Sequence, residues 1–345
     1  MTAEKITINS LVPPTWNRLK VNDTMVEIPS DVPEGLADQG LNTTEAGVSF
    51  SQMETGCGKG LTEYLVKNGT KPRLVATEGG KLVSIKKSYT GSAADVLCFE
   101  AGEGETVNIL TDASSDDNAE GTAVLRILLR AEKGARINLA QVIRPGKSMK
   151  IVNDIGSVAA EGAQINVIQV FMDGSDISAG SKTVLEGEEA SGENRIGLVR
   201  TNGQTIDMNY VMKHIAKCTR ADISVSGALS QNAVKTFRGT IDFVRGCTGS
   251  DGAESENMLL LDDTIVNKTV PLILCTEESV AGSHGATIGR PAEDILFYMM
   301  SRGITREKAV SILERASLEA AANHIEDTEA RDYVLGLIAE KYADE

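Results

Sequence analysis

The chain has 345 residues, which is long enough to bury a large core in one domain or two. It carries 34 basic and 49 acidic residues, a formal charge of −15, and no basic cluster that could neutralise phosphates, which argues against nucleic acid and anionic membranes as partners. No run of signal-peptide type follows Met1 and no apolar stretch approaches the roughly 18 residues that span a bilayer, so we expect a cytoplasmic protein.

Residues 1–70 are predicted to form a small α/β region. Its proline-containing opening includes the single Trp16, expected to anchor the segment, and Gly60 to Lys67 is predicted to be helical. Cys57 stands between two glycines in a predicted turn, and we interpret it as structural. The chain also contains Cys98, Cys218, Cys247 and Cys275, and the absence of C-x-x-C spacing indicates reduced thiols rather than a disulfide framework or a zinc knuckle.

A repeat predicts a parallel β-helix over residues 71–285. Three segments of the form Gly-x-x-(Val/Ile)-Asn-(Ile/Leu/Val) begin at Gly104, Gly134 and Gly162, 30 and then 28 residues apart. Units of this length cannot bury their own apolar face and must stack on their neighbours. A turn at glycine, followed by two inward apolar side chains around an outward Asn, is typical of one rung of a β-helix.

Other segments of the same region are assigned by pattern. Alternation or short apolar runs predict strands over residues 126–129, 169–171, 240–243, 258–261 and 269–274. Residues 173–194, rich in Gly, Ser and Glu, are predicted to be a loop outside the rungs. Residues 246–252 are predicted as a second loop, with Glu254 and Glu256 in the loop region, and residues 283–287 as a turn.

The last segment, residues 286–345, is predicted to be a helical domain. Helices are expected from Ala292 to Ser301, from Arg306 to about Asn323 with Thr305 as N-cap, and from Glu329 to Tyr342. Because a solenoid needs covered ends, we expect these helices to pack on one another and on the end of the β-helix.

The motifs from Phe237 to Ile304 resemble the carboxy-terminal part of the SufB/SufD family of iron-sulfur cluster assembly scaffolds. They are Phe237-Arg238-Gly239, Leu259-Leu260-Leu261, Pro271, His284-Gly285-Ala286-Thr287 and Leu296-Phe297-Tyr298-x-x-Ser301-Arg302-Gly303-Ile304, in the order and spacing of that family. Asp207-Met208-Asn209-Tyr210 and His214 also match, and the likeness weakens toward the amino terminus.

The resemblance implies a mainly β fold, a right-handed parallel β-helix between a small amino-terminal region and a carboxy-terminal helical domain. It implies a scaffold subunit, not an enzyme, which binds a SufC-type ABC ATPase through the terminal helices. It also implies pairing along the β-helix with a second subunit, either a copy of the chain or a SufB/SufD-type partner. A transient iron-sulfur cluster would be built or held where the subunits meet.

Cys247, Cys275 and His284 are the candidate cluster ligands, with Glu256 as a further cofactor-binding residue. Thiolates match the soft metal of such clusters, and His or a carboxylate is an occasional substitute. One chain with these donors closes a four-ligand set only if Glu254 or Glu256 joins, or if a second subunit completes it. The alternative stays open that Cys275 is a small buried hydrophobe and that Cys247 fills a turn.

The chain departs from its relatives at two positions. SufB has a cysteine in the motif that resembles Ser255-Glu256-Asn257-Met258-Leu259, and SufD has one at the position of Gly282, whereas the chain has a thiol at neither. His284 is the position that the resemblance supports best. His214 and Cys218, four apart on a predicted β segment, are about 13 Å apart on a strand and are interpreted as structural.

Two other functions are weighed. A SufD-like partner that holds no cluster and stabilises a separate SufB is the first alternative, and a polysaccharide-active β-helix enzyme is the more distant one. The sequence has no Gly-x-x-x-x-Gly-Lys-(Ser/Thr), Gly-x-Ser-x-Gly or His-Glu-x-x-His motif, so any ATP chemistry is expected in a partner.

Overall fold

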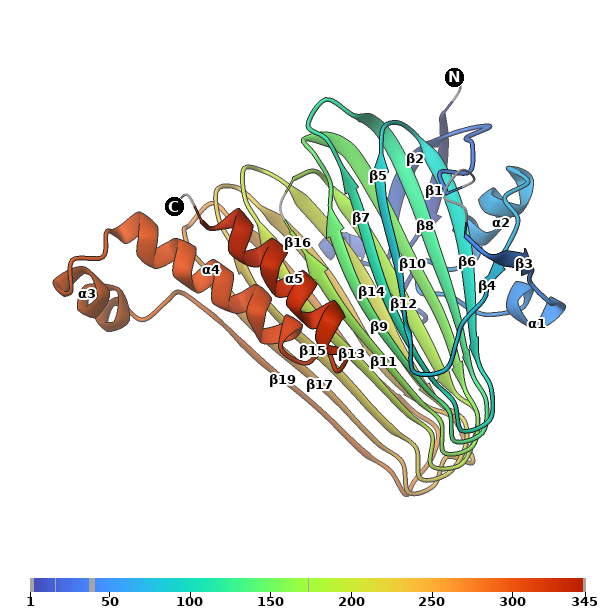
Figure 1. Cartoon of the computed structure of the whole chain (residues 1–345). Coiled ribbons are helices and arrows are strands. Elements are labelled where there is room, and N and C mark those ends of the chain that lie inside the picture. The colour runs from blue at the N-terminus through green and yellow to red at the C-terminus, as the bar shows by residue number, and fades with distance from the viewer. Residues whose placement is uncertain (1–2, 16, 37–40, 173, 344–345) are drawn as a thin grey trace.

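The computed structural model describes residues 3–15, 17–36, 41–172 and 174–343, so the predicted anchor Trp16 lies outside the described residues. The body is a parallel β-helix in which the chain passes back and forth between two facing sheets (Figure 1). A small α/β unit lies against one sheet and helices lie against the other. The mainly β fold predicted from the repeat and the resemblance is therefore confirmed.

The sheet that we call the even sheet has nine strands in the spatial order β18-β16-β14-β12-β10-β8-β6-β4-β3. Neighbours in it are parallel, except β3 and β4, which are antiparallel. Its strands are β3 (Thr43–Glu45), β4 (Arg73–Val75), β6 (Ala93–Ala101), β8 (Glu120–Ala131), β10 (Ser148–Ala159), β12 (Ile177–Leu185), β14 (Thr205–His214), β16 (Val234–Phe243) and β18 (Val266–Cys275).

The facing sheet, which we call the odd sheet, has eight parallel strands in the order β19-β17-β15-β13-β11-β9-β7-β5. Its strands are β5 (Leu82–Tyr89), β7 (Thr106–Ser115), β9 (Arg136–Arg144), β11 (Gln164–Phe171), β13 (Ser191–Arg200), β15 (Arg220–Leu229), β17 (Asp251–Leu260) and β19 (Ala281–Gly289). From β4 onward, sequence neighbours thus alternate between the sheets, and each strand pairs with the strands two places away in sequence.

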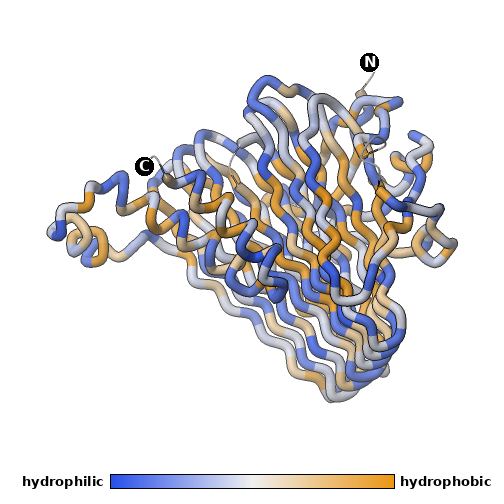
Figure 2. Tube along the Cα trace, viewed as in Figure 1, coloured by the Kyte–Doolittle hydropathy of each residue, from blue (hydrophilic) through white to orange (hydrophobic). Residues whose placement is uncertain are grey.

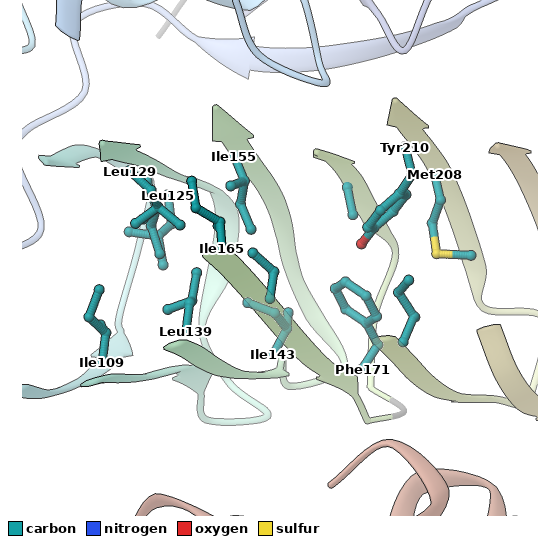
Figure 3. Packing of buried hydrophobic residues seen from close by; sticks show 14 of the residues in the cluster. Ile109, Leu125, Leu129, Leu139, Ile143, Ile155, Ile165, Phe171, Met208 and Tyr210 are labelled. Atoms are coloured by element: carbon teal, nitrogen blue, oxygen red, sulfur yellow. The ribbon is translucent and has the colours of Figure 1, made fainter. Parts of the chain in front are cut away.

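The core fills the space between the two sheets, which we call the lumen. Apolar side chains from both sheets meet there, among them Leu125 and Ile155 from the even sheet and Ile109, Leu139 and Ile165 from the odd sheet (Figure 3). The hydropathy of the trace is highest along the central strands and lower in the turns at the corners (Figure 2). Ile109, Leu139 and Val167 each follow the Asn of a repeat, as the pattern predicts.

The glycine repeat forms one corner of the β-helix, where the chain leaves the even sheet for the odd sheet. Gly104, Gly134 and Gly162 have φ angles of 69°, 64° and 64°, the left-handed region that favours glycine. Their N–H groups donate to carbonyls in the corner of the next rung, those of Lys133, Glu161 and Glu188. Later rungs place Glu189, Cys218 and Gly249 at the same position, with φ angles of 60°, 58° and 78°.

The predicted loop over residues 173–194 is wrong, because this segment contains β12 and the beginning of β13. Its small residues have a packing role instead. A Cβ atom on Gly180 would collide with the backbone at Gly56 and Cys57, so glycine lets the amino-terminal unit approach the outer face of the even sheet. Composition alone suggested a loop, whereas close packing explains the glycine.

The amino-terminal unit covers the outer face of the even sheet. It consists of the antiparallel pair β1 (Ala3–Ile8) and β2 (Thr24–Pro29), a short 3-10 turn (Asn17–Leu19), α1 (Val48–Ser51) and α2 (Lys59–Lys67). Its apolar side chains form a second core with residues of β6, β8 and β10. The predicted helix from Gly60 to Lys67 is confirmed as α2, and Cys57 lies buried in the turn before it.

Arg238 ties the same unit to β16. Its fully buried guanidinium donates to both carboxylate oxygens of Asp207, at 2.7 and 3.1 Å, and to the backbone carbonyls of Val21 and Asp23. Asn9 donates to the same carboxylate at 2.8 Å. This bidentate, charge-assisted contact fixes the amino-terminal segment to two strands far along the β-helix.

The carboxy-terminal helices are α3 (Glu293–Ser301), α4 (Arg306–Ala322) and α5 (Thr328–Lys341). Thr305 caps α4 as predicted, by accepting from the N–H of Lys308, whereas α5 begins at Thr328 and is capped by Asp327. Within the described residues no helix is both long and apolar enough to cross a membrane.

The expectation that these helices cover the end of the β-helix is wrong. Helices α4 and α5 lie on the outer face of the odd sheet, over β9, β11, β13 and β15 (Figure 1). The repeat asparagines form the seat: Asn138 donates to Asn108 and Asn166 donates to Asn138, each at 2.9 Å, and Glu326 in the α4–α5 loop accepts from Asn138 and Arg136. This polar ladder holds the helices on the side of the β-helix.

Candidate functional site

The carboxy-terminal end of the β-helix, formed by β18 and β19, is open. Each of these strands pairs on one side only, and no described helix or strand lies beyond them. Every residue of β18 and β19 is at least partly exposed, whereas the preceding strands alternate or are buried throughout. The open end therefore presents unpaired backbone groups and the last lumen side chains to solvent.

A buried ammonium group lies inside this end. Lys235 of β16 is fully buried; its Nζ donates to a carboxylate oxygen of Glu256, to Asn267 at 3.0 Å and to Thr269 at 3.2 Å. Burial lowers the pKa of Lys235, and the neighbouring Glu256 opposes that shift. The second carboxylate oxygen of Glu256 is buried and has no hydrogen-bond partner. The lumen therefore holds an acceptor atom that is free for a ligand.

Glu254 brings a second carboxylate into the same space. It is 5% exposed, and its carboxylate lies over Gly239 of β16 so closely that a Cβ atom there would collide with it. Burial, and then the charge of Glu256, raise the pKa of Glu254 to about 7, although Lys235 acts in the opposite direction. Gly239, the last residue of the Phe-Arg-Gly motif, thus makes room for a carboxylate that holds a proton near neutral pH.

His284 lies on β19, in register with Glu254 of β17. The predicted turn at residues 283–287 is wrong, since these residues lie within β19, where the parallel ladder with β17 outweighs the low strand propensity of glycine. Glu254 and Glu256 are likewise on a strand, not in a loop. The side chains of partners in register on parallel strands point to the same face of the sheet. The exposed His284 is therefore stacked next to Glu254, at the mouth of the lumen.

The two candidate cysteines lie at one corner of the last rungs. Cys275 ends β18, is exposed, and donates its thiol to the carbonyl of Glu277 at 2.9 Å, so its interpretation as a buried hydrophobe is wrong. Cys247 is fully buried in the turn between β16 and β17. Burial raises the pKa of the Cys247 thiol, and the charge of Glu277 adds to the shift. Glu277 links the two turns, because its carboxylate accepts from the N–H of Gly246 at 2.7 Å.

The predicted ligands fall into two places. Glu254 and Gly239 face each other across the lumen, and Pro271 and His284 are their partners in register. Cys275 is four residues beyond Pro271, or about 13 Å along β18. Within the described parts of the chain, no three His, Cys, Asp or Glu side chains are grouped so that they could hold a metal ion. Within one chain the donors thus form two separate groups: His284 lies near the carboxylates of β17, and Cys247 lies near Cys275 in the turns of the last rungs.

The remaining candidates have structural surroundings. His214 is buried at the end of β14, stacks on Phe243 and bonds to Thr219 at 2.7 Å, and burial lowers its pKa to about 4. Cys218 occupies the left-handed corner position and is exposed. Sequence reasoning missed Lys235, and it identified Gly239 as part of a motif without its role beside Glu254. The one available signal was the alternation of β16, which turns Lys235, Phe237 and Gly239 to the same side.

The fold and the open end define a class of protein: a β-helix protein that presents polar groups at one end of its stacked strands. Residues 84–317 match the protein family described as "SUF system FeS cluster assembly, SufBD core domain". This match runs from β5 to the middle of α4 and covers more than half of the chain. The chain belongs to the SufB/SufD family of iron-sulfur cluster assembly proteins.

Individual relatives agree with this membership. The chain is 23% identical to the iron-sulfur cluster assembly protein SufD of Bacillus subtilis over 68% of the chain and 50% of the relative. It is 26% identical to a chloroplastic SufBD family protein of Arabidopsis thaliana, over 72% and 46%. SufB of Bacillus subtilis is 28% identical over 39% of the chain and 29% of the relative. The chain thus spans half or less of the length of these curated relatives.

Proposed function

We propose that the chain is a scaffold subunit of a SUF-type assembly complex in the cytoplasm, and that it holds a nascent iron-sulfur cluster at its open end. The observation that carries the proposal is that both groups of donors lie at the end of the β-helix where the strands are unpaired. His284, Glu254 and Glu256 line the mouth of the lumen, and Cys275 is exposed on the same rung. The cluster is the cargo of this site, and no covalent step is assigned to the chain itself.

A second subunit is part of the proposal. Strands β18 and β19 are edge strands with free backbone groups, which native proteins usually cover or pair. A copy of the chain, or a SufB/SufD-type partner, would pair with them and add donors to an incomplete set. The proposed donors of the chain are Cys247, Cys275 and His284, with Glu256 beside them. Because Cys247 is buried behind Cys275, it would act only when this corner moves.

An ABC-type SufC ATPase is the second proposed partner. Helix α3 stands away from the β-helix (Figure 1), and its two aromatic side chains are exposed, Phe297 by 69% and Tyr298 by 59%, whereas Leu296 is buried. Exposed aromatic side chains on a projecting helix favour a protein contact. The acidic composition and the lack of a phosphate-binding motif support assigning ATP hydrolysis to this partner.

Anaerobic reconstitution with ferrous iron and sulfide tests the proposal. We expect His284→Ala and Cys275→Ser to lose most of the bound iron and sulfide, and Cys247→Ser to lose less, because its thiol is buried. Matched controls are Cys218→Ser, an exposed thiol in the previous corner, and His324→Ala, next to α4, and both should keep the wild-type content. Wild-type content in all three site variants would overturn the ligand assignment.

The alternative function is a SufD-like subunit that binds no cluster and stabilises a separate SufB. It is favoured by the absence of a thiol in the Ser255 to Leu259 motif, and by the longer match to SufD than to SufB. Under this alternative the wild type stays colourless after reconstitution but still co-purifies with the ATPase. Iron analysis of the purified complex, together with its mass, separates the two functions.

A further inference from the structure

The two strands at the open end are held with very different strength. Strand β18 has no glycine, and its side chains are tied inward, since Asn267 and Thr269 both accept from buried Lys235. Just beyond it, Thr276 donates to the carbonyl of Phe243 at 3.2 Å. Removing β18 from its neighbour β16 would break these contacts and leave a buried ammonium group with fewer acceptors.

Strand β19 lacks such ties. Three of its nine residues are glycines, at 282, 285 and 289, and its residues from Ala281 to Ile288 are all exposed. No side-chain hydrogen bond of Ser283, His284 or Thr287 is found among the described residues. Glycine in a strand adds no side chain to the packing and loses the most backbone entropy on ordering. What holds β19 is therefore mainly the backbone ladder to β17. Just beyond its two ends, Val280 packs on the core and Arg290 pairs with Asp263, an exposed ion pair that contributes little.

Strand β19 also lies between two parts of the molecule: strand β17, which carries the buried carboxylates, and helix α3. On one side its His284 and Ala286 are in register with Glu254 and Glu256, so it covers the edge of the strand that carries the buried carboxylates. On the other side only residues 290–292 separate it from α3, the projecting helix. A force on α3 would reach β19 through this short connection, whereas β18 lies farther along the chain from α3, on the other side of β19.

We propose that β19 is a releasable strand: it detaches from β17 while β18 and the rest of the β-helix stay folded, and its detachment uncovers Glu254 and Glu256 and carries His284 away from them. Local opening of this kind is expected where few side chains are buried and the ladder is exposed. That the opening serves cluster loading or release rests on the proposed function, whereas the opening itself does not.

Hydrogen exchange of the full-length chain tests the proposal, without iron and without an ATPase, at a concentration where the mass is that of a monomer. We expect the slowest amides of residues 281–289 to exchange at least about tenfold faster than the slowest amides of β18, which is an edge strand at the same end. Equal protection of the two strands would overturn the proposal.

A glycine replacement provides the second arm. A Cβ atom at Gly285 or Gly289 meets no heavy atom within 4 Å, and neither residue has a positive φ, so alanine fits at both. Each of Gly285→Ala and Gly289→Ala should slow the exchange of β19 by about two- to fivefold, with the double variant slower still. The control is Gly91→Ala, an equally open glycine between β5 and β6, which should leave β19 unchanged.

An unchanged β19 exchange rate in the double variant would contradict the proposal. These measurements need no cluster, so they stay informative if the ligand variants show that the chain binds none. Conversely, if the ligand variants lose iron while β19 is as well protected as β18, the proposed function is supported and the proposal of a releasable strand is overturned.

Discussion

The two ends of the β-helix are built on opposite plans. At the first end, the short β3 pairs with β4 at the edge of the even sheet, and residues 33–36 lie against β6. Leu36 enters the core, its N–H donates to Asp95 at 2.9 Å, and Pro33 accepts from the N–H of Ala94. At the last end nothing in the described chain plays that part, and the lumen contains Lys235, Glu254 and Glu256 instead of a closing layer of apolar side chains.

The difference between the two ends lies in how each one treats charged groups that are buried. A buried ion pair contributes less to stability than a well-packed apolar contact of the same volume, and a lone carboxylate such as Glu254 is costly to bury. The first end lowers this cost with a plug in which the buried carboxylate of Asp95 accepts from the N–H of Leu36 and from the hydroxyl of Tyr89, while the Leu36 side chain enters the core. The last end accepts it, which is expected where polar groups meet a ligand or a partner.

The largest effect is expected from breaking the ion pair at the open end. Lys235→Met leaves Glu256 buried without its cation and should destabilise the chain by about 3–5 kcal/mol. Lys235→Met combined with Glu256→Met removes both charges and should restore most of that loss. Urea unfolding measures both variants, and Lys217→Met, in an exposed turn, is the control. A small effect of the single variant would mean that this end is less closed to water than its burial indicates.

The next effect is a pH dependence that belongs to the open end alone. The folded chain raises the pKa of Glu254 from its ordinary 4.5 to about 7, so it binds this proton more tightly than the unfolded chain does. The stability is therefore full below about pH 4.5 and falls as the pH rises toward 7, by about 3 kcal/mol in all.

The measurement is the free energy of unfolding of the metal-free wild type minus that of Glu254→Gln, between pH 4.5 and 8. The difference should decline with rising pH and level off above 7. His214, whose pKa is lowered to about 4, contributes the opposite slope between about 4 and 6.5, but it is present in both proteins and cancels. If the difference in unfolding free energy does not change with pH, the carboxylate of Glu254 does not have a raised pKa in the folded chain.

The smallest effect concerns the plug at the first end. Asp95→Asn keeps the shape but weakens the bonds from Leu36 and from the hydroxyl of Tyr89, and should cost about 1 kcal/mol. Hydrogen exchange should rise in β5 and β6 and stay unchanged in β19. Glu103→Gln, in an exposed corner, serves as the control. Faster exchange at both ends would contradict the independence of the two ends.

Much of the fold was predictable because glycine marks the corners. Gly104, Gly134 and Gly162 defined the period, and the apolar residues around each Asn defined the inward face. The next two rungs escaped notice because Glu189 and Cys218 take the left-handed position there, although only glycine adopts it without strain. A repeat search that relies on glycine therefore ends early.

The site was harder to predict, because its members meet through register. The resemblance identified His284, but nothing in the sequence indicates that Glu254 is its neighbour in the ladder or that Gly239 faces that carboxylate. Glycine-rich composition also suggested a turn where β19 lies. The two boundaries predicted between the three domains, and the ligand set, stay predictions.

The placement of the outer layers limits how far unravelling can spread. The amino-terminal unit, clamped by Arg238, braces the even sheet as far as β16, and α4 braces the odd sheet as far as β15. Only β17, β18 and β19 extend past these two outer layers. A groove of about 340 Å³ separates α4 from the outer side of β17 and β19. We therefore expect strand separation that starts at the mouth to stop where these two outer layers begin, which would keep the body of the β-helix folded while its last strands open.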